Sequence, residues 1–138
     1  MMLTKKYLKD LIYTVNGAAI DIHKALGPGL LESVYHKCME HELQLRNINF
    51  KSELIIPLNY KGMDIDAELR CDFFVENILP VEIKSVELIL PVHEAQIISY
   101  TKLLNVPEGL LINFNVVNIF KEGQRTYVNE LYRSLPEN

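Results

Sequence analysis

The chain has 138 residues, of which 49% are hydrophobic and 23% are charged. This composition is typical of one globular domain over residues 1–138 and excludes a disordered or fibrous chain. The formal net charge of −4 does not favour nucleic-acid binding through a broad basic surface. Cys38 and Cys71 lack C-x-x-C spacing, and the first ten residues contain no apolar stretch suited to a signal peptide or membrane span. We therefore expect a soluble, cytoplasmic protein with free, buried thiols and no membrane association.

Two helices are predicted in the first third of the chain. In the first, apolar residues recur at helical spacing: Ile12, Val15, Ala19, Ile22 and Leu26. Gly27-Pro28-Gly29 ends this helix, and a second helix is predicted from near Leu30 to about Arg46. Its predicted apolar stripe is Leu31, Val34, Tyr35, Cys38, Met39 and Leu43. The remaining faces, which are expected to meet solvent, carry His36, Lys37, Glu40, His41 and Gln44.

From Phe50 onward the pattern changes to that of strands. Residues 54–60 and 63–75 are rich in apolar and β-branched residues, and Lys61-Gly62 between them predicts a hairpin turn. The pattern then predicts a turn around Asn77, a strand over 79–86, a helix over 92–105 and a buried strand over 109–114. The chain is expected to end in a hairpin of 116–121 with 126–131 or in a strand-helix tail. This order predicts an α/β domain with a mixed β-sheet flanked by helices.

Two acidic residues and a lysine are predicted to share one face of the sheet. Asp72 precedes Glu82 by ten residues, so an antiparallel pair centred on Asn77 places them opposite each other. Lys84 follows two residues later and shares that face. Opposed carboxylates repel each other unless they bind a cation, and their oxygen atoms favour Mg²⁺ or Mn²⁺. The alternative is an ordinary solvated sheet face on which Glu82 pairs with Lys84.

Asp72, after Cys71, and Val81-Glu82-Ile83-Lys84 together resemble the D…(D/E)-x-K signature of the PD-(D/E)XK nuclease superfamily. Cys71 stands where the superfamily has proline. The segment from Gly29 to Tyr35 resembles the pattern that names the GxxExxY protein family, and similar blocks follow in that family's order from about Leu11 to Tyr127. The resemblance implies a restriction-endonuclease-like fold with a core of helix, three strands, helix and strand.

The resemblance also implies roles for single residues. Asp72, Glu82, the Ile83 carbonyl and Glu32 would hold Mg²⁺ or Mn²⁺. Lys84 would serve the attacking water. Gln96 and Tyr100 match a Q-x-x-x-Y pattern found on the helix after the E-x-K motif. From the residues alone, the helical stripe that carries Gln96 and Tyr100 is better interpreted as a plain helix surface than as part of a site. Glu32 could be a first-turn acid favoured by the helix dipole.

The function that the resemblance implies is a metal-dependent nuclease acting on DNA or RNA and leaving a 3′ hydroxyl and a 5′ phosphate. The alternative is a scaffold of the same fold that binds nucleic acid or a protein without cutting, because a fold does not determine a function. A chain this small could need a second subunit, as in a homodimer, or another protein to hold DNA.

Overall fold

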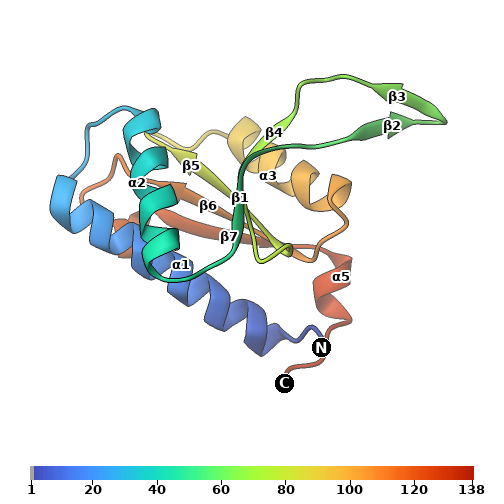
Figure 1. Cartoon of the computed structure of the whole chain (residues 1–138), viewed down its shortest axis with the longest axis horizontal. Helices are drawn as coiled ribbons and strands as arrows, with labels where there is room; N and C mark the ends of the chain where they lie inside the picture. Colours follow the sequence, from blue (N-terminus) through green and yellow to red (C-terminus); the bar gives the residue numbers. More distant parts are fainter. Residues whose placement is uncertain (1) are drawn as a thin grey trace.

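A five-stranded mixed sheet forms the centre of the protein (Figure 1). The computed structural model describes residues 2–138. In spatial order the strands are β1 (Phe50–Ile55), β4 (Arg70–Val75), β5 (Leu79–Lys84), β6 (Glu108–Asn113) and β7 (Gln124–Val128). Only β5 and β6 run parallel within this sheet, and the other neighbours are antiparallel. The predicted mixed α/β architecture is confirmed.

Helices cover both faces of this sheet. Helices α1 (Lys5–Leu26) and α2 (Glu32–Leu45) pack on one face, against Val81, Ile83, Leu110 and Ile112. Helix α3 (Pro91–Leu103) packs on the other face and approaches the sheet closely at Gly109, where an added Cβ would lie 2.8 Å from Ile97 Cγ1. No helix within residues 2–138 has the length and apolar character needed to cross a membrane.

The connection between α1 and α2 is fixed by the side chain of Tyr35. Its hydroxyl donates a hydrogen bond to the Gly27 carbonyl at 2.6 Å and accepts one from the Leu30 amide at 3.2 Å. Gly27 adopts φ +71°, a conformation that glycine tolerates without strain. The Ser85 hydroxyl donates to the Leu30 carbonyl at 2.6 Å and ties this connection to the end of β5. These contacts fix the position at which α2 begins.

The start of α2 differs from the prediction. The helix begins at Glu32, so Leu31 is its N-cap and is 73% exposed, and Val34 is 38% exposed. Neither side chain belongs to the buried stripe that was predicted. His36, in contrast, was expected to meet solvent and is half-buried against the sheet.

A small hairpin projects from the body of the protein (Figure 1). It consists of β2 (Leu58–Tyr60) and β3 (Met63–Ile65), which pair only with each other. The predicted turn at Lys61-Gly62 is confirmed, but the two long strands predicted around it are wrong. Pro57 has no amide hydrogen to donate to a ladder, and residues 66–69 are irregular, so the hairpin is separate from the pairing of β1 with β4.

Of the two alternatives predicted for the C-terminal segment, the strand-helix tail is confirmed and the hairpin of 116–121 with 126–131 is wrong. Asn118 caps a short helix, α4 (Ile119–Glu122), by accepting a hydrogen bond from the Lys121 amide. Strand β7 then pairs with β6 and forms the edge of the main sheet, and α5 (Glu130–Arg133) follows it. Asn and Asp favour helix caps over strand interiors, which accounts for the error.

Candidate active site

The ladder between β1 and β4 is interrupted at a single pair. Ser52 faces Phe73 and Leu54 faces Cys71, so no residue is inserted, yet Glu53 and Asp72 between them are not paired. Glu53 has φ +51°, a left-handed conformation that is uncommon for a residue with a side chain. The local kink turns the backbone amide of Asp72 away from β1 and makes it available to another acceptor.

Glu82 provides that acceptor. The Asp72 amide donates to Glu82 Oε2 at 2.7 Å, and the Ile83 amide donates to Asp72 Oδ2 at 2.8 Å. The regular ladder between β4 and β5 ends one pair earlier, at Phe73 and Val81. The prediction that the two acids lie side by side agrees with this geometry. The observed register, symmetric about Asn77, also agrees with the prediction that the two positions face each other. The backbone ladder itself stops one pair short of them, and side-chain oxygen atoms replace the backbone acceptors there.

Burial disfavours the state in which Asp72 and Glu82 are both ionised. Glu82 is only 3% exposed, and burial, followed by the charge of Asp72, raises its pKa to about 8. Burial also raises the pKa of Asp72, although the Ile83 amide, His36 and Lys84 act in the opposite direction. Without a cation, one proton held by the pair removes most of the repulsion. A divalent cation would allow both groups to ionise.

The donor atoms of the pair suit a hard cation. One oxygen of each carboxylate accepts an amide hydrogen bond, which leaves Asp72 Oδ1 and Glu82 Oε1 for a metal. The Ile83 carbonyl points to the same side of β5 as its amide, toward Asp72. Within residues 2–138 no three Asp, Glu, His or Cys side chains are grouped so that they alone could hold an ion. Two carboxylates, a carbonyl and retained water nevertheless match the ordinary ligand set of Mg²⁺.

A cavity of about 330 Å³ opens beside Asp72, between the first turns of α2 and the strands. Its lining includes Glu32, His36, Ser52 and Asp72. Burial raises the pKa of Glu32, the positive charges of Lys84 and His36 oppose this rise, and the charge of Asp72 adds to it. Glu32 is therefore close enough to interact with both Asp72 and Lys84.

His36 is a residue of this cavity that sequence reasoning missed. Its ring stacks on Phe73 with a centroid separation of 4.4 Å, and its Nε2 lies 2.8 Å from the Ser52 hydroxyl. Its charge lowers the pKa of both Asp72 and Glu32. The spacing from Glu32 to His36 is one helical turn, which places both on one face of α2 and could have indicated the contact.

Helix α3 closes the other side of Glu82. Tyr100 is buried beside Cys71, and burial, followed by the charge of Glu82, raises the pKa of its hydroxyl to about 12. The Gln96 side chain lies beside this hydroxyl and lowers its pKa. Gln96 and Tyr100 do not line the cavity that contains Glu32 and Asp72. His93, about one turn before Gln96 on α3, also lowers the pKa of Glu32, so the start of α3 approaches α2 at this end of the sheet.

The fold and site define a mixed α/β protein with two acids and a lysine where two central strands diverge. The sequence pattern of the PD-(D/E)XK nuclease superfamily matches residues 9–126, and the chain belongs to this superfamily. A search of the curated proteins and a search of the solved structures each give no match. Nucleases of this superfamily generally depend on a divalent metal and act on nucleic acid.

Proposed function

We propose that this protein is a metal-dependent nuclease that hydrolyses phosphodiester bonds of DNA or RNA. The observation that carries the proposal is the reciprocal hydrogen bonding of Asp72 and Glu82. It aligns the two carboxylates through backbone amides and leaves one oxygen of each for Mg²⁺ or Mn²⁺. Superfamily membership supports the same chemistry.

In this proposal Asp72, Glu82 and the Ile83 carbonyl bind the metal, and Glu32 binds it from across the cavity, either directly or through water. The bound ion supplies Lewis acidity and lowers the pKa of a coordinated water. Lys84 extends from the same strand as Glu82 and orients the attacking water or offsets charge on the phosphate. Hydrolysis leaves a 3′ hydroxyl and a 5′ phosphate.

Gln96 and Tyr100 act from the opposite side of Glu82. The buried Tyr100 hydroxyl and the adjacent Gln96 amide keep bulk water away from the carboxylate and restrict its rotation. Their role in this proposal is to position Glu82, because neither residue lines the cavity that contains Glu32 and Asp72.

Three finer assignments belong to the same proposal. The motif from Gly29 to Tyr35 supports placing the chain in the GxxExxY family within the superfamily. The free thiols of Cys38 and Cys71 suit the cytoplasm.

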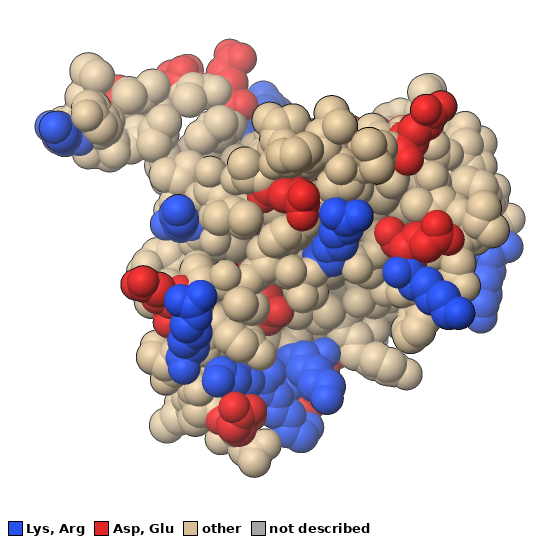
Figure 2. Space-filling view, turned by 180° about the vertical axis from the view of Figure 1, so that it is seen from behind, with Lys and Arg blue, Asp and Glu red and all other residues tan. Residues whose placement is uncertain are grey.

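Basic side chains on the face in Figure 2 are interspersed with acidic ones over most of its area. A partner, such as a second copy of the chain or another protein, would then help to hold the nucleic acid.

A binding module without catalysis is the second candidate. Two observations favour it: the net charge of −4, and the absence within residues 2–138 of three His, Cys, Asp or Glu side chains grouped for a metal. Such a module would retain the fold and bind nucleic acid or a protein, and its binding would be the same with or without metal.

The test is an assay of purified protein on single- and double-stranded DNA and RNA with Mg²⁺, with Mn²⁺ and with EDTA. Cleavage that requires metal and is lost in Asp72→Ala supports the nuclease. A matched control is Asp10→Ala, which removes an exposed acid of α1 outside the cavity. Binding that is equal in metal and EDTA, without cleavage of any substrate, would favour the binding module.

A further inference from the structure

A second cavity, of about 550 Å³, lies where the start of α1 meets β6, β7, α5 and the C-terminal segment. Its volume is within the range of roughly 300–1,000 Å³ that is usual for small-molecule sites. The lining that matters is Lys5, Lys6, Lys9, Glu108, Thr126 and Tyr132, none of which lines the candidate active site.

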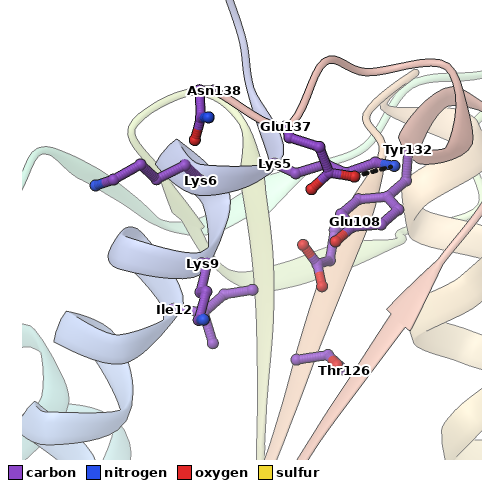
Figure 3. A pocket seen from close by; sticks show the side chains of 9 residues that line it. All are labelled: Lys5, Lys6, Lys9, Ile12, Glu108, Thr126, Tyr132, Glu137 and Asn138. Atoms are coloured by element: carbon purple, nitrogen blue, oxygen red, sulfur yellow. Dashed lines mark hydrogen bonds and ion pairs between the residues drawn. The ribbon is translucent and has the colours of Figure 1, made fainter.

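Glu108 forms the floor of this cavity. The residue is only 6% exposed, and within the part of the chain that the structure describes its carboxylate has neither a hydrogen-bond donor nor an ion-pair partner. Figure 3 shows this carboxylate directed into the cavity, between Lys9 and the Tyr132 ring. Burial raises its pKa to about 7. The Glu108 carboxylate is open to the cavity, because Asn16 Oδ1 is the only fully buried side-chain N or O atom without a partner within residues 2–138. A ligand that brings N–H donors would replace the water around this carboxylate.

The rim of the cavity is basic. Lys5 pairs with Glu137 at 3.3 Å and Lys6 pairs with Asp10 at 2.7 Å, while Lys9 makes no ion pair with any residue from 2 to 138. Both partner acids are well exposed, and such surface pairs contribute little, so an incoming anion can replace them. Basic side chains gather at the lower end of Figure 2, where Figure 1 places both ends of the chain.

The floor and the rim select different chemical groups. A simple anion would be attracted by the lysines of the rim but repelled by Glu108. A simple amine would be attracted by Glu108 but repelled by the three lysines. A ligand with paired N–H donors at one end and a phosphate at the other satisfies both. The Tyr132 ring lies beside Glu108, and Lys5 Nζ lies over this ring at 5.3 Å from its centroid, so an aromatic base would stack on Tyr132 in place of the Lys5 ammonium.

We propose that this cavity binds a guanine nucleotide, with the base edge on Glu108 and the phosphate on Lys6 and Lys9. Guanine presents two adjacent donors, N1–H and the 2-amino group, that match the two oxygens of one carboxylate. Uracil presents a single N–H between two carbonyls that would face Glu108 unfavourably. This inference goes beyond the nuclease function and does not depend on it.

Isothermal titration of the full chain in EDTA tests the proposal, with GMP, IMP, UMP and inorganic phosphate as ligands. GMP should bind most tightly. IMP lacks the 2-amino group and should bind roughly tenfold more weakly, since a hydrogen bond to a charged group is lost. Glu108→Gln should remove the preference for GMP over IMP, and Lys9→Met should weaken every nucleotide by a similar factor. Glu122→Gln, which changes an exposed acid on α4, should leave all affinities unchanged.

Three results would overturn the proposal: no detectable binding of GMP at millimolar concentration, inorganic phosphate binding as tightly as GMP, or Glu108→Gln retaining the preference for GMP over IMP. If Glu108→Gln fails to fold, the wild-type ratio of GMP to IMP affinity and the Lys9→Met titrations decide the question. Asp72→Ala should bind GMP as wild type does, so loss of nuclease activity and loss of nucleotide binding are separable.

Discussion

The carboxylates of Asp72 and Glu82 are held by reciprocal hydrogen bonds between β4 and β5. The Asp72 amide donates to Glu82, and the Ile83 amide donates to Asp72. Neither side chain can rotate away without leaving a buried N–H group unsatisfied. The kink at Glu53 makes this arrangement possible, since a continuous ladder would have directed the Asp72 amide toward β1. The two acids therefore remain adjacent although their charges repel.

Replacing Glu82 with Gln should remove the charge repulsion with Asp72 and, at the same time, weaken metal binding. The amide oxygen can still accept from the Asp72 amide, and its NH₂ group can donate to Asp72, so the metal-free variant should be at least as stable as wild type. Saturating metal should raise wild-type stability by roughly 2.7 kcal/mol at a hundredfold excess over Kd, and the variant should lose most of this gain. Thermal melts in EDTA, Mg²⁺ and Mn²⁺ measure both effects. If metal raises the melting temperature of wild type and of Glu82→Gln equally, Glu82 does not bind the metal.

Lys84→Met should abolish cleavage while it preserves the fold and the affinity for metal. Lysine is not a metal ligand, and its loss should cost about a hundredfold or more in rate, as does removal of one group that stabilises a transition state. Single-turnover cleavage measures the rate of the Lys84→Met variant, and titration with metal measures its metal affinity. Lys121→Met, on the exposed helix α4, is the matched control and should cleave as wild type does. A Lys84→Met protein that retains wild-type rates would refute the role assigned to the lysine.

Glu53→Val should destabilise the protein by roughly 1–2 kcal/mol, because a β-branched residue is strained at the positive φ of this position. It should also weaken metal binding, since relaxing the kink moves the Asp72 amide. Lys51→Val changes a neighbouring exposed position of β1 with ordinary backbone geometry, where valine is favoured, and should not reduce stability. Urea unfolding of both variants measures the difference. If Lys51→Val destabilises as much as Glu53→Val, the strain at Glu53 is not the cause.

Glu108→Gln should flatten part of the pH dependence of stability. Burial raises the pKa of Glu108 from 4.5 to about 7, so the folded state holds its proton more tightly than the unfolded state. This stabilisation is complete below pH 4.5 and is lost as the pH rises to about 7. The variant should therefore gain stability relative to wild type by roughly 1 kcal/mol at pH 8, after allowance for water in the cavity. Urea unfolding at pH 4.5, 6 and 8, with Glu122→Gln as the exposed control, measures the effect. If the free energies of unfolding of Glu108→Gln and wild type differ by the same amount at all three pH values, Glu108 does not cause this pH dependence.

Part of the site followed directly from sequence spacing. Strand alternation correctly separates the core residues Val81 and Ile83 from the polar Glu82. The turn around Asn77 is confirmed, because Glu76 and Asn77 both adopt positive φ in a short hairpin loop. A ten-residue separation across such a loop then brings Asp72 and Glu82 together. These features depend on local periodicity and turn chemistry, which a single sequence contains.

Other features depend on tertiary contacts and could not be predicted in this way. The left-handed conformation of Glu53 is not favoured by its side chain and exists because the sheet bends there. His36 looked polar and solvent-facing, yet Phe73 and Ser52 on two strands provide a surface for its ring. Pro57 lies inside the strand predicted over 54–60, and only the observed pairing of β1 with β4 shows that the chain leaves the sheet there and returns to it.

The parallel pairing of β5 with β6 has a consequence for how the site assembles during folding. The hairpin of β4 and β5 closes a short loop and can form early, which brings Asp72 near Glu82 while both are still hydrated. Strand β6 can join only after α3 has crossed the sheet, a non-local step that closes slowly. Tyr100 on α3 buries Glu82 at that step. The unfavourable desolvation of the acids thus belongs to the late stage of folding.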